Sequence, residues 1–279
     1  MQKFIEQKFI GERAMFGAKG AEFERCGFAA GESPLKHGQN LRLKNCTFEW
    51  KYPLWYTKNV AVEDGFLMQM ARAGIWYAQD VSFKDTLIQA PKSFRRCQNV
   101  RLENVNLTQA EETLWSCADV EIKNVCARGD YFAMNCENLR VYGLNLDGNY
   151  GFDGCKNLLV EDSKLLSKDA FWNCENVTVR NSFVSGEYLA WNSKNVTFEN
   201  CVIESLQGLC YVQNLVLRGC QTLDTTLAFE YSSVDAEILG GIASVKNPLS
   251  GVIRASEIGE IIIDEECVDP AATRIILEK

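Results

Sequence analysis

The sequence predicts an all-β protein: a single-stranded, right-handed parallel β-helix with a triangular cross-section, built from about 12 rungs of about 19 residues. Three observations predict it. An asparagine step recurs at a nearly constant spacing, apolar and polar residues alternate after each step, and a residue suited to a tight turn follows at a constant distance. Such a period is typical of solenoids, in which each unit buries its face only against its neighbours.

The asparagine step sets the period. The stretch "FWNCENVTVRN" at 171–181 is followed by "AWNSKNVTFEN" at 190–200. We take the asparagine before each valine or leucine as position zero, the anchor, and number the other positions of each repeat from it. The anchor positions are Gly20, Asn40, Asn59, Asp80, Asn99, Asp119, Asn138, Asn157, Asn176, Asn195, Asn214 and Ser233.

A strand follows each anchor. Positions +1 and +3 are apolar whereas +2 and +4 are polar, a period of two that indicates a half-buried strand. The chain then turns at +5, because asparagine, aspartate and glycine tolerate left-handed backbone angles. The +5 residues are Asn45, Asp64, Asp85, Asn104, Asn124, Gly143, Asp162, Asn181, Asn200 and Gly219.

Two further positions of the repeat, +8 and −5, are also apolar, as in Leu165 and Phe171. Three inward segments in each repeat predict a triangular coil. A left-handed hexapeptide helix would need aliphatic residues every six positions, which this spacing does not supply.

The sequence predicts one β-helix domain over 1–279. Residues 1–16 precede the first anchor and are expected to form an N-terminal cap. Regular rungs are expected over 17–240. The frame loosens past residue 240, so 241–279 are expected to hold irregular last coils and a C-terminal cap.

The twelve cysteines fit the same frame. Position −2 holds Cys97, Cys117, Cys136, Cys155 and Cys174, and position +6 holds Cys26, Cys46, Cys201 and Cys220. We interpret both columns as small buried hydrophobes, since a straight column does not converge on a tetrahedral metal site. We therefore expect no metal and no cofactor. The length of the chain and the lack of a CxxC pair favour reduced thiols and a cytoplasmic location.

The net charge and the hydropathy of the chain exclude two classes of binding partner. The formal net charge of −8 argues against nucleic acid and against an anionic membrane surface, both of which need a clustered basic face. No stretch approaches the roughly 18 apolar residues of a membrane span.

The repeated rung "[QKE]-N-[VL]-x-[VLF]-[EKR]-N" and the opening "GERAMF" resemble a bacterial family of right-handed parallel β-helices within the pectin-lyase-like superfamily. The resemblance covers essentially the whole chain, and it implies the fold but no specific activity. Polygalacturonases of that superfamily pair adjacent aspartates with a Gly-His-Gly step. Here the histidine is His37, without paired aspartates, and no aspartate-rich cluster suggests the calcium site of a pectate lyase.

Position −4 is the first functional candidate. Five of the six tryptophans stand there, and alternation from an inward −5 sends them outward. Tryptophan rings stack on sugars, so we expect Trp115, Trp172 and Trp191 to bind an oligosaccharide. The alternatives are a subunit interface, a covering segment, or a wrong orientation at a turn. The −4 residues are Trp55, Trp76, Arg95, Trp115, Met134, Asp153, Trp172, Trp191, Cys210 and Phe229.

Charged residues adjoin this column. Glu111 and Asp130 share position −8 one rung apart, and Asp153 interrupts the tryptophans, so we name these three as catalytic candidates. Crowded carboxylates can raise one pKa, as acid–base catalysis of glycoside chemistry requires. The candidate substrate-binding residues are Arg95, Trp115, Tyr131, Tyr150, Lys168, Trp172 and Trp191. A solvated turn is the simpler interpretation of the charged positions.

Two functions remain open. The first is a carbohydrate-binding protein or a carbohydrate-active hydrolase or lyase. The second is a non-catalytic scaffold whose tryptophan face is buried in a homo-oligomer interface.

Overall fold

The computed structural model describes residues 1–278 and shows a right-handed parallel β-helix. It has about 15 coils, whereas the sequence predicted about 12. The additional coils carry strands that the anchor pattern does not mark, at 2–5, 250–255 and 273–277. The chain forms two compact units, Met1–Asn145 and Leu146–Lys279, which are described separately below.

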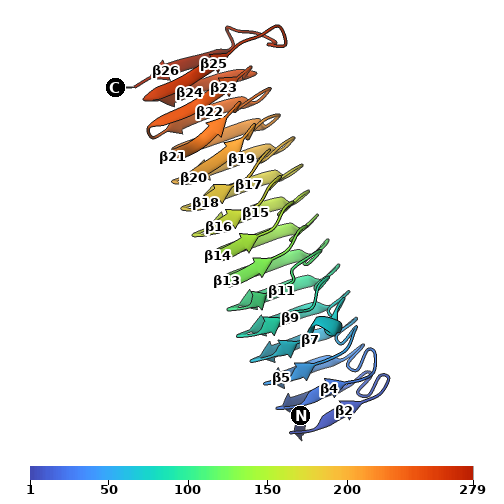
Figure 1. Ribbon diagram of the computed structural model, residues 1–279. Coiled ribbons are helices and arrows are strands. Elements are labelled where there is room, and N and C mark those ends of the chain that lie inside the picture. The colour runs from blue at the N-terminus through green and yellow to red at the C-terminus, as the bar shows by residue number, and fades with distance from the viewer. Residues whose placement is uncertain (279) are drawn as a thin grey trace. The chain divides into compact units, whose positions relative to one another are not determined.

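The first unit stacks parallel strands on two sides of each coil (Figure 1). The first side carries β1 (Gln2–Ile5), β3 (Lys19–Glu24), β5 (Gln39–Lys44), β7 (Lys58–Glu63), β9 (Gln79–Lys84), β11 (Gln98–Glu103) and the start of β13 (Ala118–Arg128). The second side carries β2 (Lys8–Ile10), β4 (Gly27–Ala29), β6 (Thr47–Phe48), β8 (Phe66–Leu67), β10 (Leu87–Ile88), β12 (Asn106–Leu107) and the end of β13. A short 3₁₀ helix, η1 (Gln69–Ala71), interrupts one coil.

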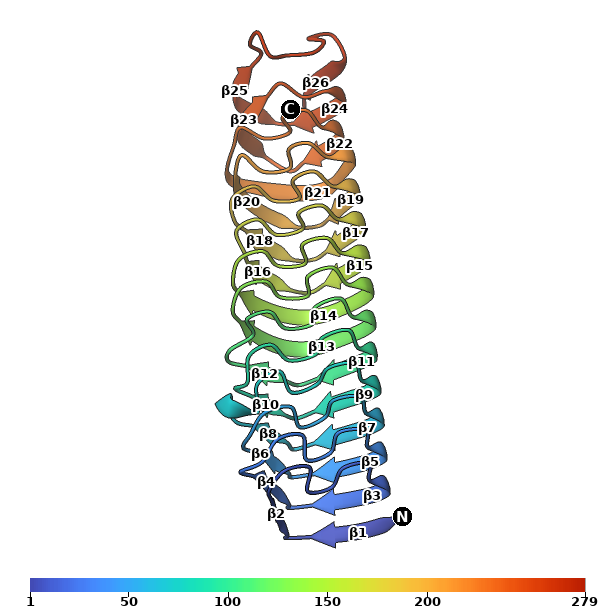
Figure 2. The ribbon, with the colours of Figure 1, turned by 90° about the vertical axis from the view of Figure 1, so that its right-hand side faces the viewer.

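The second unit repeats this plan (Figure 2). Its first side carries β15 (Lys156–Glu161), β17 (Glu175–Arg180), β19 (Lys194–Glu199), β21 (Gln213–Thr226), β22 (Ser233–Ile238), β24 (Ser250–Ala255) and β26 (Thr273–Leu277). Its second side carries β16 (Lys164–Leu166), β18 (Phe183–Ser185) and β20 (Val202–Leu206), and a separate pair is formed by β23 (Gly241–Lys246) and β25 (Glu257–Ile262). Strand β14 (Glu137–Asp147) begins in the first unit and ends in the second.

The strand register follows the repeat. In the first unit Leu41 pairs with Val60, and Val60 pairs with Val81. In the second unit Val177 pairs with Val196 in the same way. Each residue therefore lies beside the residue at the same position one coil away, and every position of the repeat forms a column.

The third side of the coil is not a long strand. In the first unit it is held by one-residue bridges from Arg95 to Trp76 and Trp115. Left-handed residues alternate along it, for example Leu114 at φ 60° and Ser116 at φ 53°. This backbone still turns −5 inward and −4 outward, so the predicted third inward segment is present without a strand.

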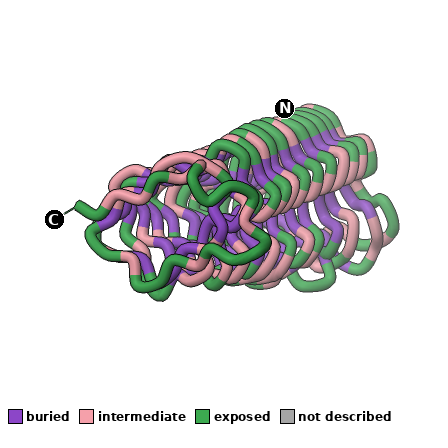
Figure 3. The backbone as a smooth tube through the Cα atoms, turned by 90° about the horizontal axis from the view of Figure 1, so that it is seen from above, coloured by how far each residue is buried: buried purple, intermediate pink, exposed green. Residues whose placement is uncertain are grey.

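The predicted inward positions form the core. The −5 and +8 residues and both cysteine columns are buried, as the banding in Figure 3 illustrates. Two residues predicted to point outward, Cys210 and Phe229, are instead fully buried at 0% exposure. Phe229 has a left-handed φ of 70°, and Leu209, at position −5 of the preceding repeat, has a similar φ of 61°. The frame therefore slips by one residue before β22. Cys210 folds its thiol back toward the carbonyl of Gln207, 3.5 Å away.

The anchors have a role that the strand pattern did not reveal. Asn195 and its column neighbours have a φ near 54–61°. The Nδ2 atom of Asn195 donates to Oδ1 of Asn176 at 2.8 Å, and Asn214 donates to Asn195 at 2.9 Å. Asparagine therefore satisfies a left-handed corner and an amide ladder at the same time.

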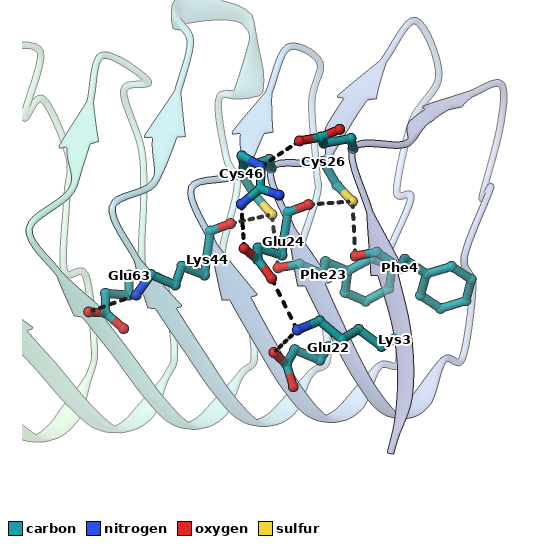
Figure 4. A network of polar contacts seen from close by, with 11 residues as sticks. Lys3, Phe4, Glu22, Phe23, Glu24, Cys26, Lys44, Cys46 and Glu63 are labelled. Carbon is teal, nitrogen blue, oxygen red and sulfur yellow. Dashed lines mark hydrogen bonds and ion pairs between the residues drawn. The ribbon is translucent and has the colours of Figure 1, made fainter.

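The polar +4 positions on the outer face of the first side include opposite charges in neighbouring coils. In the first unit Lys44 lies 3.9 Å from Glu63, and both are more than half exposed. Lys3 contacts Glu22 and Glu24 near the start of the chain (Figure 4). Such exposed pairs contribute at most about 1 kcal/mol each and mainly favour register.

Candidate functional site

The tryptophans of the first unit form a stack. The rings of Trp55 and Trp76 are 5.1 Å apart and nearly parallel, at 9°. Their indole N–H groups donate to backbone carbonyls one coil further on, as Trp76 Nε1 does to Lys92 at 2.9 Å. Stacking covers much of the area of these rings. The column points outward as predicted, but the faces of Trp76 are occupied by its neighbours.

Arg95 is part of this stack. Its guanidinium lies 4.7 Å from the ring centre of Trp76 and 4.4 Å from that of Trp115. Nη2 of Arg95 pairs with Glu112 at 2.9 Å, and Lys92 pairs with the same carboxylate at 3.0 Å. Arg95 was predicted to bind substrate. In the structure its guanidinium takes part in a cation–π and ion-pair network, while its buried Nε atom has no hydrogen-bond partner among the described residues.

The carboxylates predicted in the first unit lie on the coil surface. Glu111 is exposed and Asp130 is half-buried, one coil further along the same column. The backbone between them is joined by the N–H of Glu112, which donates to the carbonyl of Asp130 at 3.0 Å. Tyr131 is 38% exposed and meets Trp115 edge to face, with ring centres 6.4 Å apart.

A second aromatic column, which was not predicted from the sequence, lies at position −3. His37 stacks on Tyr56 at 5.1 Å, and Tyr56 stacks on Tyr77 at 4.8 Å. Phe16 and Arg96 extend the series on either side. The recurrence of aromatic residues three positions before the anchor was a signal that could have revealed it.

The aromatic side chains of the second unit are less tightly stacked. Trp172 and Trp191 have ring centres 6.4 Å apart and are tilted by 34°. Trp172 Nε1 donates to the carbonyl of Tyr188 at 3.0 Å, and Tyr188 meets Trp191 edge to face at 5.6 Å. The residue before Trp172 in its column is Asp153, which leaves that side of the indole without an aromatic neighbour.

Asp169 is the most unusual ionisable residue of this region. It is only 3% exposed. In the part of the chain that the structure describes, its carboxylate forms no hydrogen bond or ion pair. Burial raises the pKa of Asp169, and the nearby charges of Glu187 and Asp153 raise it further, although Lys168 opposes them.

The neighbours of Asp169 are already engaged. Lys168 Nζ lies 2.8 Å from Glu187 and 5.7 Å from the ring centre of Tyr188. Asp153 accepts a hydrogen bond from Asn173 Nδ2 at 3.2 Å. The second unit thus brings two predicted site residues, Asp153 and Lys168, near a carboxyl that was not predicted, and Trp172 follows that carboxyl three positions later in the chain. The sequence offered one indication of Asp169. It stands at position −7, where three neighbouring repeats have a tyrosine: Tyr131, Tyr150 and Tyr188.

This arrangement suits proton transfer more than metal binding. A carboxyl with a raised pKa can act as a general acid near neutral pH, and a second carboxylate nearby can accept or stabilise charge. Within residues 1–278, no three His, Cys, Asp or Glu side chains are grouped so that they could hold a metal ion. The same residues include no helix long and apolar enough to cross a bilayer.

Residues 2–276 match the model of a family described as "Protein of unknown function (DUF3737)". The chain belongs to this family. A comparison with curated proteins finds no match for this DUF3737 member.

Solved structures similar to this DUF3737 chain include the A-module of mannuronan C-5 epimerase AlgE4 from Azotobacter vinelandii. That match has 11% identity and a TM-score of 0.29, and it covers 99% of this chain and 87% of the other. The periplasmic alginate epimerase AlgG matches at 8% identity and TM-score 0.31, covering 92% and 76%. The surface adhesin PfbA of Streptococcus pneumoniae matches at 11% identity and TM-score 0.27, covering 87% and 67%. At these values the likeness concerns β-helix architecture alone.

Proposed function

We propose that this chain binds an oligosaccharide over Trp172 and Trp191 and presents Asp169 to it as a proton donor. The single observation that carries the proposal is Asp169, a residue only 3% exposed whose carboxylate forms no hydrogen bond or ion pair with the described residues, three positions before an indole that lacks an aromatic neighbour on one side. The reaction class would be hydrolysis of a glycosidic bond: Asp169 protonates the leaving oxygen as its bond to the anomeric carbon breaks, and a water molecule then adds to that carbon and gives its proton to the Asp169 carboxylate. We also place the chain, as part of this proposal, within the pectin-lyase-like superfamily.

Each partner has a separate role in this proposal. Trp172 is held by its bond to the Tyr188 carbonyl, so its ring is fixed before a sugar arrives. Asp169 would supply the proton to the leaving oxygen. Asp153 lies one coil earlier, near enough to raise the pKa of Asp169, and would stabilise the positive charge that develops on the sugar.

The predicted carboxylates of the first unit, Glu111 and Asp130, remain alternative catalytic candidates. They lack the burial that distinguishes Asp169, because Glu111 is exposed and Asp130 only half-buried. Glu111→Gln and Asp130→Asn therefore serve as comparison variants in the same assays.

The test is titration of tryptophan fluorescence with neutral, acidic and amine-bearing oligosaccharides, followed by assay of reducing ends. We expect saturable binding to one class, loss of at least about tenfold in affinity for Trp172→Ala, and loss of turnover but retained binding for Asp169→Asn. Trp50→Ala is the matched control, since Trp50 is exposed and lies outside the −4 column. No binding to any class by the folded protein would refute the proposal.

One observation favours a second function, a scaffold. Tyr56 in the −3 column of the first unit is 43% exposed, and Phe16, whose ring contacts His37 of that column, is 47% exposed. Exposed aromatic columns are typical of protein interfaces. If light scattering shows a dimer that Tyr56→Ser dissociates, while sugars have no effect, the scaffold function replaces the carbohydrate function.

A further inference from the structure

We propose that the first unit carries a docking surface for an acidic segment of another protein, a segment that also presents apolar side chains. The surface, here named the cationic face, is the third side of the coil between residues 33 and 96, and the 3₁₀ helix η1 adjoins it. It belongs to a different unit from Asp169 and Trp172, so the inference does not depend on the carbohydrate function.

Basic residues gather on the cationic face. Although the chain has a formal net charge of −8, the segments 33–37, 51–56, 72–77 and 91–96 hold no acidic residue. Backbone hydrogen bonds place these segments on successive coils. Glu32 and Glu112 border the face, and they pair only with its residues Lys51, Lys92 and Arg95. The basic residues of the face are Lys36, Lys51, Arg72, Lys92, Arg95 and Arg96.

Three of these cations have no carboxylate partner. Lys36, Arg72 and Arg96 form no ion pair with any residue that the structure describes. Lys36 Nζ lies 5.5 Å from the ring centre of Trp55, and the guanidinium of Arg96 lies 5.9 Å from that of Tyr77. A cation–π contact positions the charge without using its N–H donors. The face therefore presents positioned donors to carboxylates, at a reduced cost in side-chain entropy.

Exposed apolar side chains adjoin the cationic face. Trp50 is 37% exposed, and Met68 and Met70 are 38% and 39% exposed. Trp50 directly precedes Lys51, whereas the two methionines stand at the start of η1, which projects from the coils in Figure 2. The N–H of Met68 donates to the carbonyl of Phe48 at 2.9 Å, so Trp50 and the methionines lie on neighbouring coils. Thioethers adapt to apolar groups of many shapes, which suits them to a polypeptide partner.

The aromatic rings favour a polypeptide over a sugar or a nucleic acid. His37 and Tyr77 cover the two faces of Tyr56, with ring centres 5.1 and 4.8 Å away. Trp55 is stacked on Trp76 at 5.1 Å. Sugars and bases bind aromatic side chains through open ring faces, which these stacked columns do not offer. A polypeptide requires only cations for its carboxylates and exposed apolar groups for its apolar side chains, and the surface has both.

The experiment is fluorescence anisotropy with labelled peptides of defined composition. One peptide repeats Glu-Glu-Leu, a second of the same length repeats Glu-Glu-Ser, and a third repeats Lys-Lys-Leu. We expect the Glu-Glu-Leu peptide to bind at least about tenfold more tightly than the Glu-Glu-Ser peptide, and the Lys-Lys-Leu peptide not to bind. The affinity for the Glu-Glu-Leu peptide should fall as salt is added, because charges contribute to the attraction.

Variants assign the binding to the cationic face. Arg72→Glu should weaken binding of the Glu-Glu-Leu peptide about fivefold or more. Arg42→Glu is the matched control, because Arg42 is exposed on the first side of the same unit and also forms no ion pair among the described residues. Met70→Ser should reduce the affinity for the Glu-Glu-Leu peptide and leave that for the Glu-Glu-Ser peptide unchanged. Trp172→Ala should change neither affinity.

Other results would overturn the inference. Equal binding of the Glu-Glu-Leu and Glu-Glu-Ser peptides would show that the apolar side chains take no part. Oligothymidylate or a galacturonate oligomer that binds more tightly and displaces the Glu-Glu-Leu peptide would assign the face to a nucleic acid or a glycan. A dimer in light scattering that Arg72→Glu dissociates would assign it to a second copy of the chain. Equal losses for Arg72→Glu and Arg42→Glu, or no peptide binding by protein shown folded by circular dichroism, would refute a docking surface at this face.

Discussion

Lys168 is paired with Glu187 across neighbouring coils, with Nζ 2.8 Å from Oε2. The pair places both a cation and an anion next to Asp169, yet neither forms a bond to its carboxylate. The electrostatic state of Asp169 therefore depends on a contact between two other residues.

Glu187→Gln should lower the pKa of Asp169. The substitution removes a negative charge that raises this pKa, and it releases Lys168, which lowers it. Burial, the largest cause of the shift, is unchanged, so the pKa should stay above the ordinary aspartate value. A carboxyl ¹³C NMR titration measures the change. Glu175→Gln, at a half-buried position of the same coil as Asp169, is the control and should leave the titration where it is.

Asp169→Asn should increase stability more at neutral than at acid pH. The pKa of Asp169 is raised in the folded chain, so the folded state binds more protons than the unfolded state between the two pKa values. Ionisation of Asp169 therefore lowers the unfolding free energy as pH rises from the ordinary aspartate range through the folded pKa. Lys168, Glu187 and Asp153 are the charges that face it.

Urea denaturation at pH 3.5 and pH 7 measures the effect of Asp169→Asn. The difference in unfolding free energy between variant and wild type should be more favourable to the variant at pH 7. The control Asp162→Asn, at an exposed turn of the same unit, should show no such pH dependence. If the stability of Asp169→Asn relative to the wild type fell as pH rises, the raised pKa of Asp169 would be contradicted.

Arg95→Ala should destabilise the chain by about 1–2 kcal/mol. The change removes two cation–π contacts and leaves Glu112 with Lys92 as its remaining ion-pair partner. Arg101→Ala is the control: Arg101 is 66% exposed and lies 3.8 Å from Glu121, so its loss should cost less than about 0.5 kcal/mol. Equal shifts in the urea midpoint for the two variants would show that the stacking of Arg95 between the indoles does not contribute to the stability of the fold.

Only two of the twelve thiols should react rapidly with a disulfide reagent in the native protein. Cys126 is exposed and Cys267 is intermediate, whereas the other cysteines are buried. Burial also raises the pKa of Cys46 to about 11 and that of Cys210 to about 12, so these two thiols carry little thiolate at neutral pH. The contact with Cys201 lowers the pKa of Cys220 to about 7, and only its burial protects that thiol from the reagent. Absorbance of the released thiol counts the sites, and all twelve should react in denaturant. Fast reaction of more than two in the native state would contradict the buried columns.

Much of the architecture follows from local rules that a sequence displays. Val177 and Val196 pair because each stands at +1, and Asn181 turns the chain because its φ of 48° suits asparagine. A one-residue slip would reverse every side chain of a rung, so period and alternation together leave little freedom. The cysteine columns were predictable for the same reason.

The sequence by itself determined the coil, its period and the positions that face the core, because these depend on neighbours within one repeat and its copies. Only the tertiary structure decided what the outward side chains do. Arg95 lies between two indoles, and Asp169 is buried beside Asp153, because residues from different coils meet in three dimensions. The alternation of apolar and polar residues does not specify the contacts of outward side chains. Their burial and their partners depend on ring orientations and ion pairs, which the spacing of the repeat does not determine.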